Sequence, residues 1–405
     1  MERQPLLGRD LQGLKYLDLL LPLLDELHSV GCQRDKAGNR KLHYDQYCLL
    51  VLLFLFNPAL RSLRSLQQAT KLKQVQGKLG CPRTSLGSLS EAVDVFDPKR
   101  LEGIIWELLG QLPPTRRVGG DQLGQTLTAV DGSVIKTLAS LAEAAYLSDK
   151  NGRSHSGWRF HTHFDVDRGI PTRMEVTSAV NSGKTDEKQV LRKQLEPDHC
   201  YVLDRWYAEF TLWNEIVAAK SSYVCRIRDN SNLSDVVEER PVSVPVRQAG
   251  VLRDVIVKLG SGSKTHTRPN HTVRVVLVQA TPHKKTGGRK GGTAGPPSDG
   301  ILRIATNLLD VPAEVIADIY QHRWTIELFF RFFKHVLGCR HLLSTDPVGI
   351  QIQAYCAIIA CLLISLWTGG KPTLRRYEMI CLYFMGWADL EELNAHLAQL
   401  KPQKS

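Results

Sequence analysis

The stretch QTLTAVDGSVIKTL, residues 125–138, decides the fold class of this 405-residue chain. Its β-branched residues and alternating apolar positions predict a strand. GWRFHTHFDVD (157–167) and PTRMEVTSAV (171–180) predict two further strands. Helix and strand then alternate through TDEKQVLRKQL (185–195), CYVLDRWY (200–207), EFTLWNEIVAAK (209–220) and SYVCRIRDN (222–230). A hairpin-linked sheet followed by such alternation predicts a mixed α/β fold.

The flanking segments divide the chain into five predicted regions. They are a helical region (1–120), the first part of the sheet (121–228), a basic β insertion (229–300), the rest of the sheet with a long helix (301–370) and a tail (371–405). The first region carries Arg61, Arg64, Lys71, Lys73 and Lys78. These cations suit DNA binding, but an ordinary helical domain with a solvated basic face fits them equally well.

The composition excludes wholesale disorder, because 43% of the residues are hydrophobic. None of the nine cysteines lies in a C-x-x-C pair, which argues against a zinc ribbon and indicates buried thiols in a reducing cytosol. The apolar runs at 47–60 and 349–369 are interpreted as buried helices, the first being too short to cross a bilayer and the second containing Gln351 and Gln353. No membrane partner is therefore expected.

Positive charge is concentrated in the insertion. The chain has 52 Lys and Arg against 41 Asp and Glu, a net charge of +11. Between residues 246 and 300, ten basic residues face only Asp254 and Asp299, so this segment holds eight of the eleven net charges. The polar stretch HKKTGGRKGGTAGPPSDG (283–300) carries Lys284, Lys285, Arg289 and Lys290. This concentration favours a phosphate-binding surface.

The segment VPAEVIADIYQHRWTIELFFRFFKHVLG, residues 311–338, predicts one long helix. On it, Tyr320, Arg323, Glu327 and Lys334 fall within an arc of roughly 60° at about 100° per residue. An acid flanked by cations and a phenol suits a site for metal and phosphate. The alternative is a solvated face with a favourable Arg323–Glu327 pair.

Two aspartates strengthen the first interpretation. Asp131 lies inside an otherwise apolar strand, and Asp204 ends another. A carboxylate in a core strand is costly unless it is paired or binds metal. Singly, each has an ordinary explanation, since Asp-Gly at 131–132 is typical of a hairpin turn and Asp204 could cap a helix. Two strand-borne aspartates and a helix-borne glutamate together are harder to explain that way.

With these motifs the sequence resembles the DDE transposases of bacterial insertion sequences, specifically the insertion-sequence-four family. Its Y-x2-R-x3-E-x6-K signature is matched by Tyr320, Arg323, Glu327 and Lys334, and the two aspartate blocks by VDGSVIK around Asp131 and VLDRWY. The resemblance covers about residues 40–370. It implies an RNase H-like catalytic core with a β insertion between the second aspartate and the glutamate.

The resemblance also implies a mechanism. Asp131, Asp204 and Glu327 would be the catalytic residues and would hold two Mg²⁺ ions, with Mn²⁺ as a substitute. The substrate would be double-stranded DNA. A homodimer of the protein would bind the terminal inverted repeats of its element and carry out cut-and-paste transposition. The protein would act in a bacterial cytoplasm, associated with the nucleoid when bound to DNA. The expected DNA-binding residues are Tyr320, Arg323, Lys334, Trp206, Lys284, Lys285, Arg289 and Lys290.

Several alternatives stay open. A catalytically silent repressor derived from a transposase, or a plain metal nuclease, would share many of these features. Trp206 departs from the small residue usual in its block, and residues 229–300 contain no Trp, Tyr or Phe on which a flipped base could stack. Trp206, Trp213 or Trp324 would have to take that role. His161 and His163 share a strand face and could bind zinc, although ordinary strand histidines are favoured. If Asp131 proved to be structural, Asp165 and Asp167 would be the alternative catalytic acids.

Overall fold

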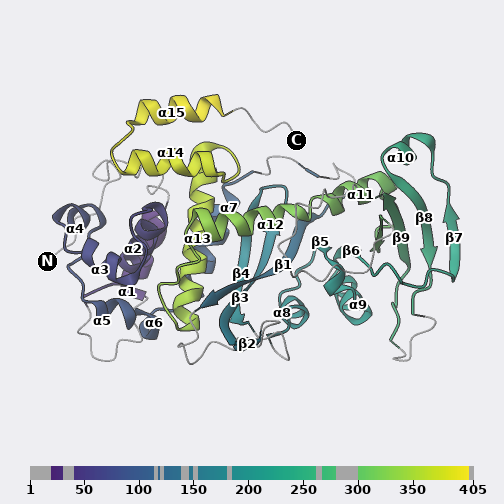
Figure 1. Cartoon of the computed structure of the whole chain (residues 1–405), viewed down its shortest axis with the longest axis horizontal. Coiled ribbons are helices and arrows are strands. Elements are labelled where there is room, and N and C mark those ends of the chain that lie inside the picture. The colour runs from purple at the N-terminus through teal and green to yellow at the C-terminus, as the bar shows by residue number, and fades with distance from the viewer. Residues whose placement is uncertain are drawn as a thin grey trace.

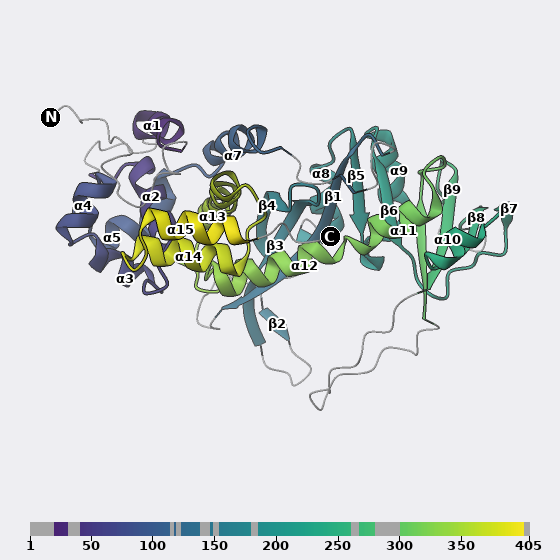
Figure 2. The same cartoon turned by 90° about the horizontal axis from the view of Figure 1, so that it is seen from above.

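The computed structural model describes residues 20–30, 41–113, 117–118, 123–137, 146–148, 154–179, 185–260, 267–279 and 300–400. Within these ranges, the chain forms a ten-stranded sheet with helices on both faces and at one end (Figures 1 and 2). The expected mixed α/β class is confirmed. The strands are β1 (Thr126–Thr137), β2 (Tyr146–Ser148), β3 (Ser154–Asp165), β4 (Ile170–Ser178), β5 (His199–Leu203), β6 (Ser222–Arg226), β7 (Val236–Arg240), β8 (Val251–Val257), β9 (Val273–Gln279) and β10 (Ile301–Thr306).

The helices that follow or flank the strands occupy most of the remaining described chain. They are α1 (Leu21–Val30), α2 (Tyr44–Phe56), α3 (Leu63–Ala69), α4 (Lys73–Leu79), α5 (Leu86–Ser90), α6 (Ala92–Val95), α7 (Arg100–Gly110), α8 (Glu187–Lys193), the short 3₁₀ turn η5 (Arg205–Tyr207), α9 (Phe210–Ala218), α10 (Val244–Gln248), α11 (Ala313–Gln321), α12 (Trp324–Arg331), the π-helical turn η6 (Phe332–Val336), α13 (Pro347–Thr368), α14 (Leu374–Phe384) and α15 (Leu390–Gln399).

The sheet runs in the order β2-β3-β1-β5-β6-β10-β9-β8-β7, with β4 also paired to β3. β3 runs antiparallel to both β1 and β4, whereas β5 and β6 run parallel to β1. Because β1 continues without a turn through Asp131 and Gly132, the hairpin-turn explanation of Asp131 is wrong.

The strands of the insertion extend this same sheet. β9 pairs antiparallel with β10, β8 with β9, and β7 with β8. β7 has the sequence VVEER and lacks the apolar alternation from which strands are predicted, so the sequence does not reveal it. Lys284, Lys285, Arg289 and Lys290 lie outside the described residues.

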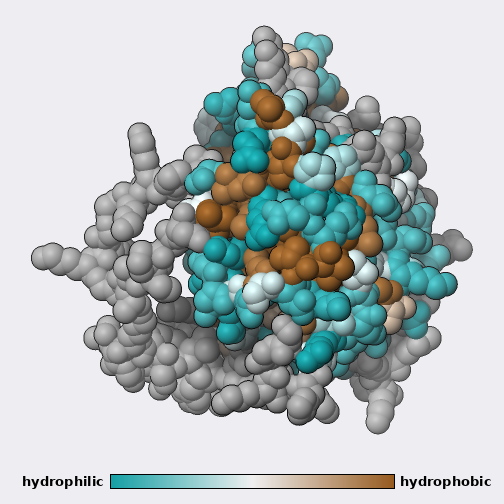
Figure 3. Space-filling view, turned by 90° about the vertical axis from the view of Figure 1, so that its right-hand side faces the viewer, coloured by the Kyte–Doolittle hydropathy of each residue, from teal (hydrophilic) through white to brown (hydrophobic). Residues whose placement is uncertain are grey.

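The far end of the sheet is formed by β7 and α10. Figure 3 shows this end as apolar patches interleaved with hydrophilic residues, and Val237 and Val244 are 58% and 69% exposed. On β7 the exposed valine is followed directly by Glu238 and Glu239, which are also exposed. Charges of this kind on an edge strand discourage pairing with another chain.

The predicted long helix is divided in the structure. After α11, the backbone N–H groups of Arg323, Thr325 and Ile326 bond to carbonyls three residues back, which tightens the helix at this point. Further along, Leu337 N–H bonds to the Phe332 carbonyl five residues back, which widens the helix into η6. The expectation of one regular helix is therefore wrong, although α11, α12 and η6 follow one another across the sheet (Figure 1).

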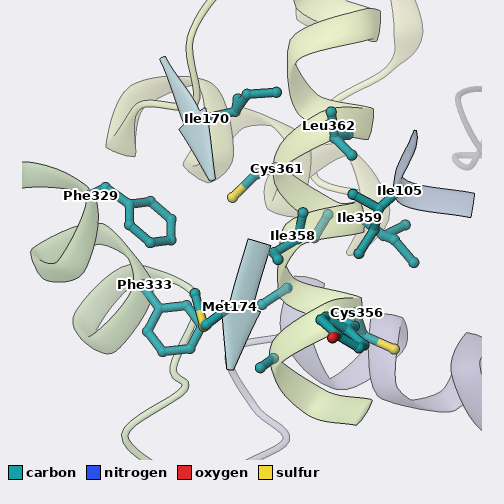
Figure 4. Packing of buried hydrophobic residues seen from close by; sticks show 14 of the residues in the cluster. Ile105, Ile170, Met174, Phe329, Phe333, Cys356, Ile358, Ile359, Cys361 and Leu362 are labelled. Carbon is teal, nitrogen blue, oxygen red and sulfur yellow. The ribbon is translucent and has the colours of Figure 1, made fainter. Parts of the chain in front are cut away.

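A shared apolar core holds α12 and η6 against the sheet. Phe329 and Phe333 point towards Met174 of β4 and towards α13, as Figure 4 shows. α13 packs on β4, α7 and α2. It is long and apolar enough to cross a membrane, but 89% of its most apolar window is buried inside the protein. The expectation that both apolar runs form buried helices is confirmed.

Candidate functional site

Asp131 and Asp204 lie level with each other on neighbouring parallel strands. The register of β1 and β5 pairs Thr126 with His199 and Ala129 with Val202. Continued by two residues, it brings Asp131 opposite Asp204, which directly follows β5. Directly opposite residues share a face of the sheet, so both carboxylates emerge on the same side.

The surroundings of Asp131 disfavour its ionised form. Burial, assisted by the nearby carboxylate of Asp204, raises the pKa of Asp131 from 3.8 to about 7. The Gly132 N–H, which donates to Asp131 Oδ1 at 2.8 Å, and the Arg323 guanidinium oppose this rise. Two carboxylates this close together repel each other, and a cation between them would relieve the repulsion.

Arg323 lies between Asp131 and Glu327. Its Nη2 donates to Glu327 Oε1 at 2.5 Å, and its Nη1 lies 3.8 Å from Asp131 Oδ2. Tyr320 is buried beside Arg323, and burial raises the pKa of its phenol to about 12, so the hydroxyl stays neutral. The signature residues of α11 and α12 thus meet the strand-borne aspartates on one side of the sheet.

Lys334 makes a backbone contact in this structure. It belongs to the π-helical turn η6, and its Nζ donates to the carbonyl oxygen of Val134 on β1 at 2.8 Å. Burial lowers the pKa of this ammonium group. Lys334 therefore ties η6 to β1 three residues beyond Asp131.

The turn after β5 places an aromatic ring beside Asp204. Asp204 Oδ1 accepts from the Trp206 N–H at 2.7 Å, so this aspartate does cap the short helix η5. The Trp206 side chain is half exposed, and the Lys188 ammonium lies 5.3 Å from its ring centroid. Trp213 is buried, which leaves Trp206 and the exposed Trp324 as the accessible tryptophans among the three considered.

Glu187 is a site residue that the sequence does not reveal. It begins α8, is only 8% exposed, forms an ion pair with Arg159 and accepts from Tyr207 Oη at 3.0 Å. Its carboxylate lies against Gly132, immediately after Asp131. A glycine inside a strand often marks a close approach by another group, and Gly132 is the one signal in the sequence that could lead to Glu187.

The two alternative acids, Asp165 and Asp167, lie away from Asp131. Asp165 pairs with Thr128 across β1 and β3, an odd number of residues from the Asp131–Thr162 pair, so it emerges on the opposite face. Its carboxylate binds the Arg168 guanidinium at 2.8 Å. Asp167 accepts from the Val118 N–H at 2.8 Å. Both contacts assign these acids to structural roles.

His161 and His163 are buried on β3, and burial lowers the pKa of each to about 3. Across the described parts of the chain, no three His, Cys, Asp or Glu side chains lie close enough together to hold a metal ion, and these two histidines have no such partners. His161 instead contacts the Thr177 hydroxyl at 2.8 Å. They are strand histidines of the core.

A pH dependence follows from these two histidines. Both stay neutral in the folded protein, while in the unfolded chain they take up protons below about pH 6.5. The stability that depends on keeping these two histidines neutral is therefore fully present above pH 6.5 and is lost as the pH falls towards 3. Each histidine should add roughly 1.4 kcal/mol per pH unit to this loss. Urea unfolding of the wild type and His163→Gln between pH 4 and 8 checks this, and equal pH slopes would contradict it.

Comparison with known proteins gives consistent results. The family model described as "Transposase DDE domain" matches residues 122–363. A putative transposase, y4zB, of Sinorhizobium fredii is 27% identical over 68% of this chain and 68% of its own length. A probable transposase for insertion sequence element IS5377 of Geobacillus stearothermophilus is 26% identical over 52% of this chain and 49% of that protein.

A third relative has a higher sequence identity over a shorter part of the chain. A putative transposase for insertion sequence element IS4SA of Synechocystis is 43% identical over 16% of this chain and 21% of its own length. Among solved structures, the cryo-EM structure of the piggyBac transposase synaptic complex with hairpin DNA aligns with 98% of this chain and 86% of that chain, at 10% identity and a TM-score of 0.43.

Proposed function

This chain belongs to the transposase DDE domain family, and we propose that it is the cut-and-paste transposase of a bacterial insertion sequence. In this proposal it binds the terminal inverted repeats of its element, cleaves phosphodiester bonds there and transfers the 3′ ends into target DNA. The Y-x2-R-x3-E-x6-K residues support assignment to the insertion-sequence-four family. The protein would act in the cytoplasm, as a homodimer on paired DNA ends.

One observation carries the proposal. Asp131 and Asp204 emerge level from adjacent strands, and Arg323 joins Asp131 to Glu327 from the helix above them. Arg323 thus contacts one acid of the sheet and one acid of the helix, and Asp204 lies level with the first of them. A solvated surface pair between Arg323 and Glu327 would have no need of Asp131.

The chemistry of the three acids suits divalent metal ions, but in this structure their carboxylates do not lie close enough together to hold one while Arg323 pairs with Glu327. Metal binding in this proposal therefore requires Arg323 to release Glu327. Carboxylate oxygens are the ligands that Mg²⁺ prefers. Burial and, after it, repulsion from Asp204 raise the pKa of Asp131, and a cation would relieve that repulsion. Asp131, Asp204 and Glu327 would hold two Mg²⁺ ions, or Mn²⁺ in their place. When bound, such a pair supplies an activated water or DNA 3′-hydroxyl and stabilises the leaving oxygen.

The remaining side chains would position the DNA. Arg323 presents a planar guanidinium group that suits phosphate oxygens once it releases Glu327. Tyr320 offers a neutral hydroxyl, and the half-exposed Trp206 offers a ring face beside Asp204. Lys334 would act on the DNA through a change of partner from the Val134 carbonyl.

The strand order supports an RNase H-like catalytic core. Strands β4, β3 and β1 form an antiparallel meander, and β5 and β6 add to β1 in parallel. In the proposed core, this arrangement ends at β6, and β7, β8 and β9 form the insertion between Asp204 and Glu327. The helices between residues 20 and 113 would form the DNA-binding region, where Arg61, Arg64 and Lys71 are exposed.

The test is a reaction of the purified protein with DNA carrying the ends of its element. Cleavage at those ends with Mg²⁺, its loss in EDTA and joining of the 3′ ends to a target plasmid are the expected results. A protein that binds the ends without cutting them would be a repressor. Cutting without joining, or without preference for the ends, would indicate a plain nuclease.

The basic segment of the insertion supplies a separate prediction. Alanine at Lys284, Lys285, Arg289 and Lys290 together should weaken binding to all DNA sequences alike. It should also flatten the dependence of log K on log salt concentration by roughly 0.9 for each phosphate that the protein no longer neutralises. Fluorescence anisotropy across a salt series measures both quantities. An unchanged slope would show that these four residues do not bind DNA.

A further inference from the structure

We propose that Glu187 is a positioning residue that fixes the spacing of the Asp131 and Asp204 carboxylates from the opposite face of the sheet. This inference rests on the metal site proposed above. Figure 2 shows α8, which begins with Glu187, on one side of the strands and α12, which carries Glu327, on the other. Glu187 would therefore act behind the site without touching substrate.

The contacts of Glu187 reach both aspartate-bearing segments. Tyr207 is fully buried in the turn η5, three residues after Asp204, and its hydroxyl donates to Glu187 Oε2 at 3.0 Å. Arg159 of β3, the strand that pairs with β1, forms an ion pair with the other carboxylate oxygen. One buried carboxylate thus fastens η5 to the strand beside Asp131.

Gly132 provides the space for this carboxylate. A Cβ atom built at residue 132 would lie 2.8 Å from Glu187 Cδ and 2.9 Å from its Oε1. The backbone of Gly132 is extended within β1, so the glycine is needed here for the close approach of Glu187. The carboxylate therefore rests directly on the peptide unit that follows Asp131.

β1 is held from both faces at this point. On the side of α12, Lys334 Nζ donates to the Val134 carbonyl oxygen at 2.8 Å. On the side of α8, Glu187 presses on Gly132 and pairs with Arg159, which lies opposite Val134 in β3. Burying a carboxylate at a helix contact costs free energy, and an apolar residue would pack at this position at a lower cost. Its placement beside both aspartates is explained if it orients them.

The experiment measures Mn²⁺ binding to the DNA-free protein by calorimetry. Tyr207→Phe removes one hydroxyl, and Glu187→Gln keeps the shape of the side chain while removing its charge. Each should raise the Mn²⁺ dissociation constant about tenfold, as is typical when a group that orients a metal ligand is changed. Binding of end DNA in EDTA should be unchanged.

The matched control is Asp254→Asn. Asp254 is another buried acid paired with an arginine, Arg274, at 2.7 Å, but it lies on β8 in the insertion. This variant should lose stability in urea without changing Mn²⁺ affinity, which separates orientation of ligands from a general structural role. If Glu187→Gln does not fold by circular dichroism, Tyr207→Phe alone decides.

Asp131→Asn and Asp204→Asn serve as references that separate two kinds of failure. If neither weakens Mn²⁺ binding, the proposed metal site itself is wrong. If both weaken it while Tyr207→Phe and Glu187→Gln bind Mn²⁺ within twofold of the wild type, the metal site stands and the role of Glu187 is refuted. If Asp254→Asn weakened Mn²⁺ binding as much as Glu187→Gln does, the role of Glu187 would likewise be refuted.

Discussion

Glu327→Gln is expected to abolish Mg²⁺-dependent cleavage of transposon-end DNA while leaving binding of that DNA intact. Glutamine keeps the size of the side chain and can still accept a hydrogen bond from Arg323, which the glutamate accepts at 2.5 Å. It lacks the negative charge with which a carboxylate binds Mg²⁺. The rate of cleavage should fall at least about a hundredfold, because even groups that only orient metal ligands change activity by up to that factor.

A solvated surface pair would behave differently. In that case the same substitution would cost only about 0.3–0.5 kcal/mol of stability and would leave cleavage unchanged. Glu314→Gln is a matched control, since Glu314 lies on α11 at the start of the same helical run and outside the acidic site. A gel-shift assay and a cleavage assay on the same DNA measure both variants. Wild-type cleavage by Glu327→Gln would refute the role of Glu327.

Arg323→Ala is expected to impair both binding of the DNA ends and their cleavage. The guanidinium lies between Asp131 and Glu327, and in the proposed site it would bind a phosphate of the DNA end. A hydrogen bond to a charged group contributes about 1.5–3 kcal/mol, so binding should weaken roughly tenfold or more. Cleavage should fall further, because the phosphate is no longer aligned.

Arg323→Lys should restore little, because an ammonium group cannot make the two parallel hydrogen bonds of a guanidinium. Arg375→Ala, at an exposed position of α14, controls for the loss of one positive charge. The measurements are the dissociation constant for end DNA and the single-turnover rate of cleavage. If Arg323→Ala impaired binding and cleavage only as much as Arg375→Ala, Arg323 would have no specific role.

Much of the sheet could be predicted because its strands bury apolar faces. The stretch around Asp131 has alternating apolar positions, and the stretch before Asp204 is continuously apolar. Both form strands where expected. β7 escapes prediction because VVEER is a polar edge strand that is recognisable only from its pairing with β8. Regular helix periodicity likewise gives no sign of the tightening at Arg323 or the widening at Phe332, which depend on local hydrogen bonding.

The same distinction applies to the site. Arg323 and Glu327 could be paired from their spacing on a helix. The level placement of Asp131 and Asp204 required the parallel register of β1 and β5, which no local pattern encodes. Glu187 is indistinguishable in the sequence from the charges beside it, because only the tertiary structure turns it inward onto Gly132 and Tyr207.

The proposed function depends on Asp131, Asp204 and Glu327 together holding divalent metal ions. Anomalous diffraction from crystals of the protein grown with end DNA and soaked in Mn²⁺ tests it most directly. Two manganese peaks about 3.5–4 Å apart are expected, bounded by these three carboxylates, with Arg323 withdrawn from Glu327. Manganese bound elsewhere, or an Arg323 that still bridges Asp131 and Glu327 with no peak between them, would contradict it.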